Sequence, residues 1–202
     1  MQETDLEGSE REFRQACAAG RHDDAVALIF ERYGVGLLRF LADRLPSRAD
    51  AEDVLSDVAV KMLSAVPTLD LRCSARAWAY TVARNAAIDF HRRPHRRPGR
   101  NMSLTSPEAA GVAQQLRTTT AAYLKTSVKN RFRELRQQLP EEDQTVLVLR
   151  LDRGFSWDEI AAVTLPGTSG QAQQAETARL RQRFKRAKDK LQALATREGL
   201  LD

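Results

Sequence analysis

Residues 139–161 read LPEEDQTVLVLRLDRGFSWDEIA, and residues 179–191 read RLRQRFKRAKDKL. In the first stretch Pro140 precedes three acidic residues, which is typical of a helix start, since proline fits the first turn and carboxylates interact well with the helix dipole. Ser156 and Glu159 match a capping box, which begins a second short helix. The second stretch repeats apolar residues at helical spacing among basic ones. Together these features predict a helix-turn-helix, whose second helix can enter the DNA major groove.

Upstream of this motif, apolar residues recur every three or four positions, which predicts further helices over 23–45, 49–66, 74–93 and 121–139. Residues 94–120 are rich in Pro, Gly, Ser and Thr and have too few large apolar side chains to form a core, which indicates a linker. The sequence therefore predicts an all-α protein with two small helical domains joined by a flexible linker, the C-terminal one a helix-turn-helix. The expected divisions are an N-terminal extension (1–24), a first domain (25–93), the linker (94–120) and a second domain (121–202).

The composition excludes several classes of protein. No run approaches the roughly 20 apolar residues that span a bilayer, and the first twenty residues lack the apolar core of a signal peptide. We therefore expect a cytoplasmic protein without membrane insertion. The two cysteines, Cys17 and Cys73, form no Cys/His cluster, so we expect no metal site and no cofactor. With no Gly-rich phosphate loop and no nucleophile motif, we do not expect an enzyme.

Charge is unevenly distributed within the net +5 of the 202 residues. Residues 1–90 carry 11 basic and 15 acidic side chains, residues 91–138 carry 11 and 2, and residues 139–202 carry 10 of each. An acidic first part and basic later segments favour partners of opposite charge, with nucleic acid as one of them. The residue pattern alone also fits a stand-alone helix-turn-helix transcriptional regulator, and that alternative leaves the acidic helix start at residues 50–57 without a role.

Four stretches together resemble the sigma factors of bacterial RNA polymerase, in the extracytoplasmic-function (ECF) group of the sigma-70 family. They are IFERYGVGLLRFLADRLPSRADAEDVLSDV (29–58), ARAWAYTVARNAAIDFHRR (75–93), and the two C-terminal stretches quoted above. The resemblance implies that the first domain corresponds to region 2 and the second to region 4. It implies core RNA polymerase and promoter DNA as partners, transcription initiation as the function, and an anti-sigma factor as a further candidate partner.

The resemblance also implies three sets of site residues. Residues that would dock on the polymerase lie in the second predicted helix: Glu52, Asp53, Ser56 and Asp57, with Ser56 standing where the family usually has glutamine. Residues that would open and read the minus-ten element lie in the third: Trp78, Tyr80, Arg84, Asn85, Asp89, Arg92 and Arg93. Residues that would read the minus-thirty-five element lie in the last: Arg179, Arg181, Arg183, Lys185 and Arg186.

One segment departs from the family in length. Between Val163 and Leu180 the chain is about nine residues longer than the usual turn of this helix-turn-helix, judged by aligning the flanking motifs. Either the turn is expanded into a loop, or the last helix begins earlier, near Gln171. The two alternatives place different side chains at the start of the recognition helix.

Overall fold

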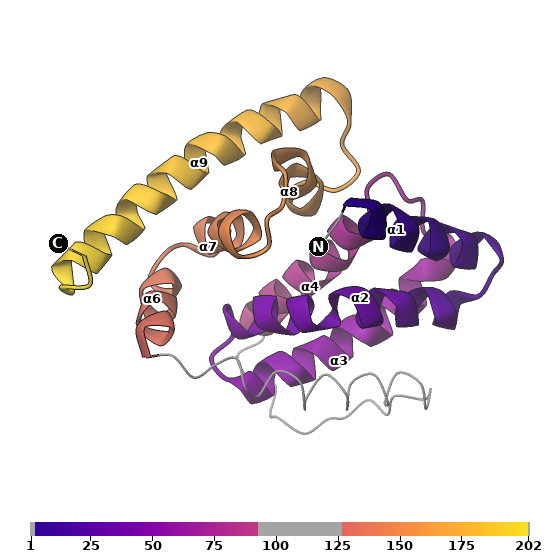
Figure 1. The fold of residues 1–202 in the computed structure, drawn as a ribbon, viewed down its shortest axis with the longest axis horizontal. Helices are drawn as coiled ribbons and strands as arrows, with labels where there is room; N and C mark the ends of the chain where they lie inside the picture. Colours follow the sequence, from indigo (N-terminus) through magenta and orange to yellow (C-terminus); the bar gives the residue numbers. More distant parts are fainter. Residues whose placement is uncertain (1–2, 93–126, 202) are drawn as a thin grey trace. The chain divides into compact units, whose positions relative to one another are not determined.

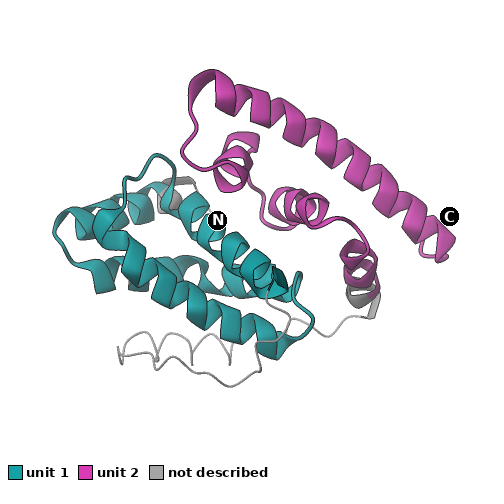
Figure 2. Ribbon diagram, turned by 180° about the vertical axis from the view of Figure 1, so that it is seen from behind, with its two compact units in different colours: residues 1–120 teal, residues 121–202 magenta. Residues whose placement is uncertain are grey.

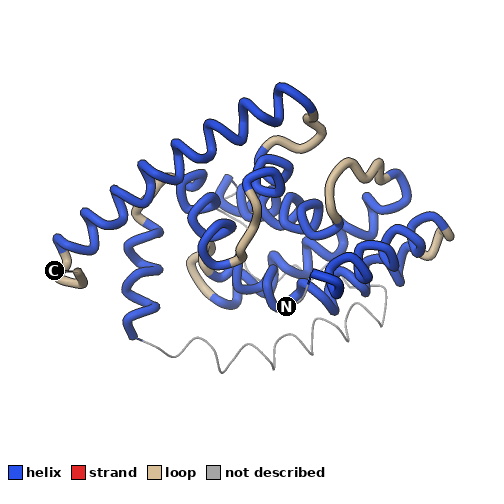
Figure 3. Tube along the Cα trace, turned by 45° about the horizontal axis from the view of Figure 1, so that its top comes forward, coloured by secondary structure: helices blue, strands red, loops and turns tan. Residues whose placement is uncertain are grey.

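The protein is described by a computed structural model, which covers residues 3–92 and 127–201 (Figure 1). In these two ranges the chain forms helices, turns and short connections and no strand, which confirms the all-α prediction (Figure 3). The chain divides into two compact units, residues 1–120 and 121–202 (Figure 2). Arg93 and the predicted linker over 94–120 lie outside the described residues. No helix in the described ranges is long and apolar enough to cross a membrane.

The first unit is built around α2, which packs against α1, α3 and α4. Its helices are α1 (Glu3–Ala18), α2 (His22–Ala42), α3 (Arg48–Ala65) and α4 (Ala75–Arg92), with a 3₁₀ turn at Val66–Thr68 after α3. The last three helices agree with the predicted ranges to within a few residues. The first does not stand apart as an extension: Phe13 and Ala16 of α1 are buried, so this helix belongs to the same core.

A close approach in this core depends on a glycine in α2. Tyr80 of α4 is 2% exposed, and its ring packs edge-on against Phe40 with the ring centroids 5.4 Å apart. A Cβ atom on Gly36 would lie 2.6 Å from the Tyr80 hydroxyl oxygen, which is too close for any pair of heavy atoms that are not hydrogen-bonded. Gly36 therefore permits α4 to lie close to α2 at this point.

The second unit is a helix-turn-helix with a long last helix. It contains α6 (Ser127–Gln137), α7 (Glu141–Leu147), a π-helical stretch (Val148–Asp152), α8 (Trp157–Thr164) and α9 (Gly170–Arg197). The apolar face of α9 packs against α6, α7 and α8, and its core includes Leu139, Leu147 and Ala187. The extra residues before Leu180 are mostly helical, so of the two alternatives the early helix start is the observed one.

The predicted capping box at the start of α8 is confirmed. The Ser156 hydroxyl accepts the backbone N–H of Glu159 at 3.2 Å, and the Glu159 carboxylate accepts the backbone N–H of Ser156 at 2.9 Å. Two backbone donors that the helix itself cannot satisfy are thus paired, which fixes where α8 begins. The short turn 165–169 then connects α8 to α9.

Candidate functional site

The acidic candidates lie on the first half of α3. Ser47 caps this helix, because its hydroxyl oxygen accepts the backbone N–H of Asp50 at 3.1 Å. The inner face buries Val54 and Val58, and the outer face carries the four predicted docking residues, of which Asp53 is exposed. The other three, Glu52, Ser56 and Asp57, are half-buried.

Two of these four side chains are held by neighbours on the same helix. Glu52 accepts a hydrogen bond from Arg48 at 2.7 Å, and the Ser56 hydroxyl donates to the Glu52 carbonyl at 3.1 Å. An ion pair one turn apart on a partly exposed helix surface contributes only a few tenths of a kcal/mol, about 0.3–0.5, so it can be exchanged for another partner at little cost. Asp53 carries the outward negative charge of this surface.

On α4 the structure separates the predicted DNA-binding residues into two groups. Trp78, Asn85, Asp89 and Arg92 follow one another at intervals of seven, four and three residues, which places them along one side of the helix. Asn85 and Arg92 are exposed, and Trp78 and Asp89 are half-buried. These four side chains form a continuous candidate surface, which we call the α4 face.

Tyr80 and Arg84 lie off the α4 face. Tyr80 packs in the core between α4 and α2, so its ring is not available for stacking on a base. Arg84 is half-buried, about one quarter of a helical turn or more from Asn85. The family resemblance grouped Tyr80 with the DNA-binding residues, and the local sequence does not show that this aromatic side chain faces inward.

Asp89 connects the two candidate surfaces of the first unit. Its carboxylate pairs with the Lys61 ammonium of α3 at 2.7 Å, and both side chains are nearly half exposed. The pair joins the helix with the docking residues to the helix with the α4 face. Exposed ion pairs of this kind contribute little to stability.

A contact that the sequence did not indicate covers the start of α4. Phe13 of α1 lies with its ring centroid 5.9 Å from that of Trp78, and Glu10 of α1 accepts the backbone N–H of Ala75 at 2.7 Å. Arg14 donates to Glu10 at 2.8 Å and to the Cys73 carbonyl at 3.3 Å. We call Glu10, Phe13 and Arg14 the α1 clasp. It fixes both the Trp78 ring and the loop before α4.

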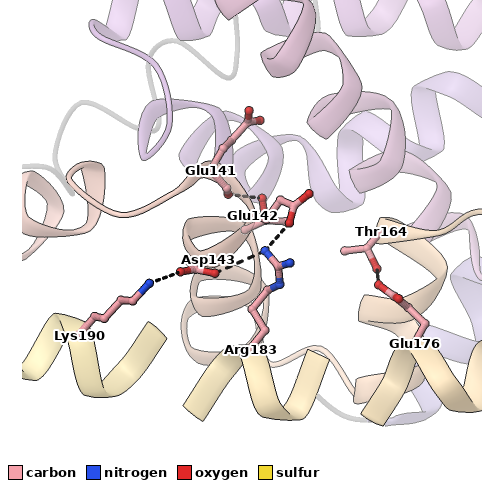
Figure 4. Close-up of polar contacts among 8 residues, drawn as sticks. Glu141, Glu142, Asp143, Thr164, Glu176, Arg183 and Lys190 are labelled. Atoms are coloured by element: carbon pink, nitrogen blue, oxygen red, sulfur yellow. Dashed lines mark hydrogen bonds and ion pairs between the residues drawn. The ribbon is translucent and has the colours of Figure 1, made fainter. Parts of the chain in front are cut away.

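In the second unit, an acidic residue at the start of α7 binds two cations of α9 (Figure 4). Asp143 is buried, and its carboxylate lies 3.5 Å from the Arg183 guanidinium and 3.6 Å from the Lys190 ammonium. Arg183 also pairs with Glu142. Arg183 therefore fastens α9 to α7, and its charge is already compensated within the protein.

The other four predicted residues of α9 face solvent. Arg179, Arg181, Lys185 and Arg186 are all exposed, on the side of the helix away from the buried Leu180 and Ala187. Within the described ranges none of these four side chains forms an ion pair, and a row of cations on a recognition helix attracts DNA phosphates and can reach base edges. α8 precedes α9 in the chain, as the first helix of a helix-turn-helix does. The exposed surface of α9 has the basic composition that DNA binding by this motif requires.

Aromatic contacts pack α8 against α9. Trp157 of α8 packs edge-on against Phe184 of α9 with centroids 5.5 Å apart, and the Arg150 guanidinium lies 4.9 Å from the Trp157 ring centroid. Arg150 also donates to the Phe155 carbonyl at 2.7 Å. These contacts connect the π-helical stretch to α8 and α8 to α9, the helix that carries the basic face.

The chain is similar in sequence to known proteins. Residues 29–97 match the family model of sigma-70 region 2. The chain is 27% identical to the RNA polymerase sigma factor YlaC of Bacillus subtilis (strain 168) over 144 residues, which are 71% of this chain and 81% of YlaC. It is 26% identical to the ECF RNA polymerase sigma factor SigX of the same organism over 140 residues, 69% of this chain and 72% of SigX.

The fold matches a solved structure as well. The structure of CnrH in complex with the cytosolic domain of CnrY superposes with a TM-score of 0.62 at 23% identity, covering 93% of this chain and 97% of that one. The described helices thus follow a known all-helical arrangement. Residues 29–97 are thus similar to sigma-70 region 2, and the chain is similar to two RNA polymerase sigma factors, one of which is named as an extracytoplasmic-function (ECF) sigma factor.

Proposed function

We propose that this protein is a sigma factor, a non-enzymatic subunit that acts in the cytoplasm by joining core RNA polymerase to promoter DNA. In this role α3 docks on the polymerase, the α4 face opens and reads the minus-ten element, and α9 reads the minus-thirty-five element. The relatives named as RNA polymerase sigma factors support the assignment. The contacts described above support the division of labour among the helices.

The outward carboxylate of Asp53 is the observation that carries the proposal. An exposed acidic surface repels DNA phosphates, so a protein that bound DNA alone would gain nothing from it. Asp53 lies on a capped helix that packs directly against the helix with the α4 face. A basic surface of the polymerase would be attracted to Asp53 and would bring promoter DNA to the neighbouring helix.

The α4 face has the chemistry needed to hold an opened strand. Arginine attracts phosphates, the Asn85 amide can pair with an unpaired base, and Trp78 is a half-buried aromatic side chain of the kind on which bases stack. Capturing unstacked bases supplies binding free energy that offsets the opening of base pairs. Its position within a folded helix means that this surface is already ordered before DNA binds.

A binding assay with sigma-free bacterial core RNA polymerase tests the proposal. The Asp53→Lys/Asp57→Lys variant should bind at least about tenfold more weakly than the wild type, because two attractive charges become repulsive. The matched control is Asp23→Lys/Glu31→Lys, which makes the same change in net charge at two exposed positions of α2. The control should bind like the wild type.

The outcomes separate the two candidate functions. Equal binding by the Asp53/Asp57 variant, with its fold intact by circular dichroism, would remove α3 from the polymerase interface. If the wild type binds promoter DNA tightly and shows no affinity for core polymerase, the protein is a stand-alone helix-turn-helix regulator. Binding that is lost only in the α3 variant supports the sigma factor.

A regulatory protein partner, of the anti-sigma kind, is part of the proposal. CnrH, whose fold is similar, was solved with the cytosolic domain of another protein bound to it. Such a partner would cover the α3 or α9 surfaces and so prevent assembly with the polymerase. A complex of this chain with such a partner should therefore not bind core polymerase. Removal of the partner should restore the binding.

A further inference from the structure

The first two turns of α9 differ in chemistry from the rest of the helix. The helix begins at Gly170, and its residues 170–175 read GQAQQA, which contain no charge. Basic residues begin only at Arg179. The helix therefore has a neutral, amide-rich start followed by a basic continuation, and the extra length of this chain before Leu180 supplies the amide-rich part.

The contacts with α8 fix how this part of the helix is turned. Thr164 of α8 donates to the Glu176 carboxylate at 3.3 Å, and the Thr177 hydroxyl donates to Asp158 at 3.3 Å. Thr177 and Leu180 are buried. Because an α-helix advances 100° per residue, the opposite side of α9 must face solvent.

That opposite side carries one continuous exposed stripe. Seven exposed side chains point within about 80° of one common direction around the helix axis. They are Gln171, Gln174, Ala175, Ala178, Arg181, Gln182 and Lys185. Glu176, the single acidic residue between 170 and 188, points to Thr164 and away from the stripe. Between Gln171 and Lys185 the stripe carries no acidic side chain, and the exposed Asp189 follows one turn beyond Lys185.

Glutamine amides and alanine methyls suit particular base pairs. A glutamine side chain can accept from N6 and donate to N7 of adenine, and a methyl group contacts the methyl of thymine. Gln171 and Gln174 are one turn apart, a rise of about 4.5 Å along the helix, which is close to the spacing of neighbouring base pairs. Small residues at 175 and 178 let the helix approach the bases closely.

We infer that Gln171 and Gln174 are specificity-determining residues, which read neighbouring A·T base pairs of the upstream promoter element, while Arg181 and Lys185 bind its phosphates. The inference rests on the proposed function, since it requires α9 to be the DNA-recognition helix. It assigns sequence preference to the neutral start of the helix and general affinity to the basic continuation. Gln173 is excluded from this role because it is half-buried on another side of the helix.

The test is a selection from a DNA duplex library that is randomised over the upstream element, using the full chain bound to core RNA polymerase. Gln171→Ala/Gln174→Ala should lose roughly fivefold to hundredfold of the preference for A·T at one or two positions. The slope of log affinity against log salt should stay unchanged, because no charge is removed. Alanine is the best helix former, so the variant keeps the helix.

Three further variants test the assignment residue by residue. Gln174→Glu should move the preference at one position from A·T toward C·G, since a carboxylate accepts from N4 of cytosine. Gln192→Ala, an exposed amide near the other end of α9, is the matched control and should leave the selected sequence unchanged. Lys185→Ala should weaken binding to all sequences alike and reduce the salt slope by about one.

Failure of the inference is distinct from failure of the proposed function. If the double alanine variant forms a polymerase complex and selects the same sequence as the wild type, Gln171 and Gln174 do not read bases, and the sigma factor proposal stands. If the wild-type chain does not bind core polymerase, the proposed function fails. Selection by the isolated chain then decides whether the amides read bases for a stand-alone regulator.

Discussion

The Glu10 carboxylate of α1 accepts the backbone N–H of Ala75, the first residue of α4, at 2.7 Å, although the two residues are 65 positions apart in the chain. The other carboxylate oxygen accepts a hydrogen bond from Arg14 at 2.8 Å. Ser74 accepts the backbone N–H of Ala77 at 3.1 Å, so two of the unsatisfied donors at this helix start are paired. One of them depends on a side chain from a different helix.

Replacing Glu10 should therefore destabilise the first unit. Glu10→Ala removes a charged acceptor from a helix start and should lower the free energy of unfolding by about 1–2 kcal/mol. Urea unfolding followed by Trp78 fluorescence, in a Trp157→Phe background, measures the change in this unit alone. Glu12→Ala, an exposed residue of the same helix, is the control and should change stability by less than about 0.5 kcal/mol. Equal losses in both variants would contradict the capping role.

The α1 clasp shows where prediction from the sequence stops. Helices α2 to α4 were predictable because each repeats apolar residues at helical spacing over several turns. In α1 only Phe13 and Ala16 are buried apolar residues among the described side chains, and the partner of Glu10 is remote in the sequence. A local pattern cannot reveal such a contact.

The same limit applies to single residues of the candidate sites. The basic helix α9 was predictable from its composition, and its arginines look alike in the sequence. Only the packing shows that Arg183 binds Glu142 and Asp143 whereas Arg181 faces solvent. Likewise, the position of Tyr80 in the core follows from its approach to Gly36, which is a contact between two helices.

Gly36 should not tolerate a side chain. Gly36→Ala would place a methyl carbon 2.6 Å from the Tyr80 hydroxyl oxygen, so either Tyr80 or the helix must move. We expect a loss of about 1–3 kcal/mol in the stability of the first unit, which is usual for overpacking a core. Gly8→Ala is the matched control, since no atom lies within 4 Å of the added carbon, and it should stabilise α1 slightly. A neutral Gly36→Ala variant would show that α2 and α4 have room to separate.

Arg183 and Arg181 should differ in what their loss affects. Arg183→Ala breaks the pairs with Glu142 and Asp143 and should destabilise the second unit by about 1–2 kcal/mol, with the salt slope of DNA binding unchanged. Arg181→Ala should leave stability within about 0.5 kcal/mol and reduce the salt slope by about one. Thermal unfolding of the full chain measures the stability effect. Filter binding of DNA by the full chain with core polymerase measures the salt slope, so the two variants can be distinguished. If Arg183→Ala lowers the salt slope as much as Arg181→Ala, Arg183 also contacts phosphate.

Cys73 beside the α1 clasp should react slowly as a thiol. Burial raises the pKa of the Cys73 thiol, the negative charge of Glu10 raises it further, and Arg14 opposes them more weakly. Since the thiolate is the reactive form, the alkylation rate of Cys73 by iodoacetamide should reach its half-maximum at a higher pH than that of an unfolded cysteine peptide, whose pKa is about 8.5.

The raised thiol pKa has a consequence for stability. The unfolded chain ionises at a lower pH than the folded one, so folding stability is fully present below the pKa of the unfolded thiol and falls as the pH rises through the folded value. Measuring the alkylation rate of the Cys17→Ser variant, which leaves Cys73 as the single thiol, against pH gives the pKa directly. The urea midpoint of the same variant should fall above about pH 8.5 more steeply than that of Cys17→Ser/Cys73→Ser. A half-maximal rate at or below the pH of the peptide would show that the loop before α4 opens freely and that the clasp does not shield it.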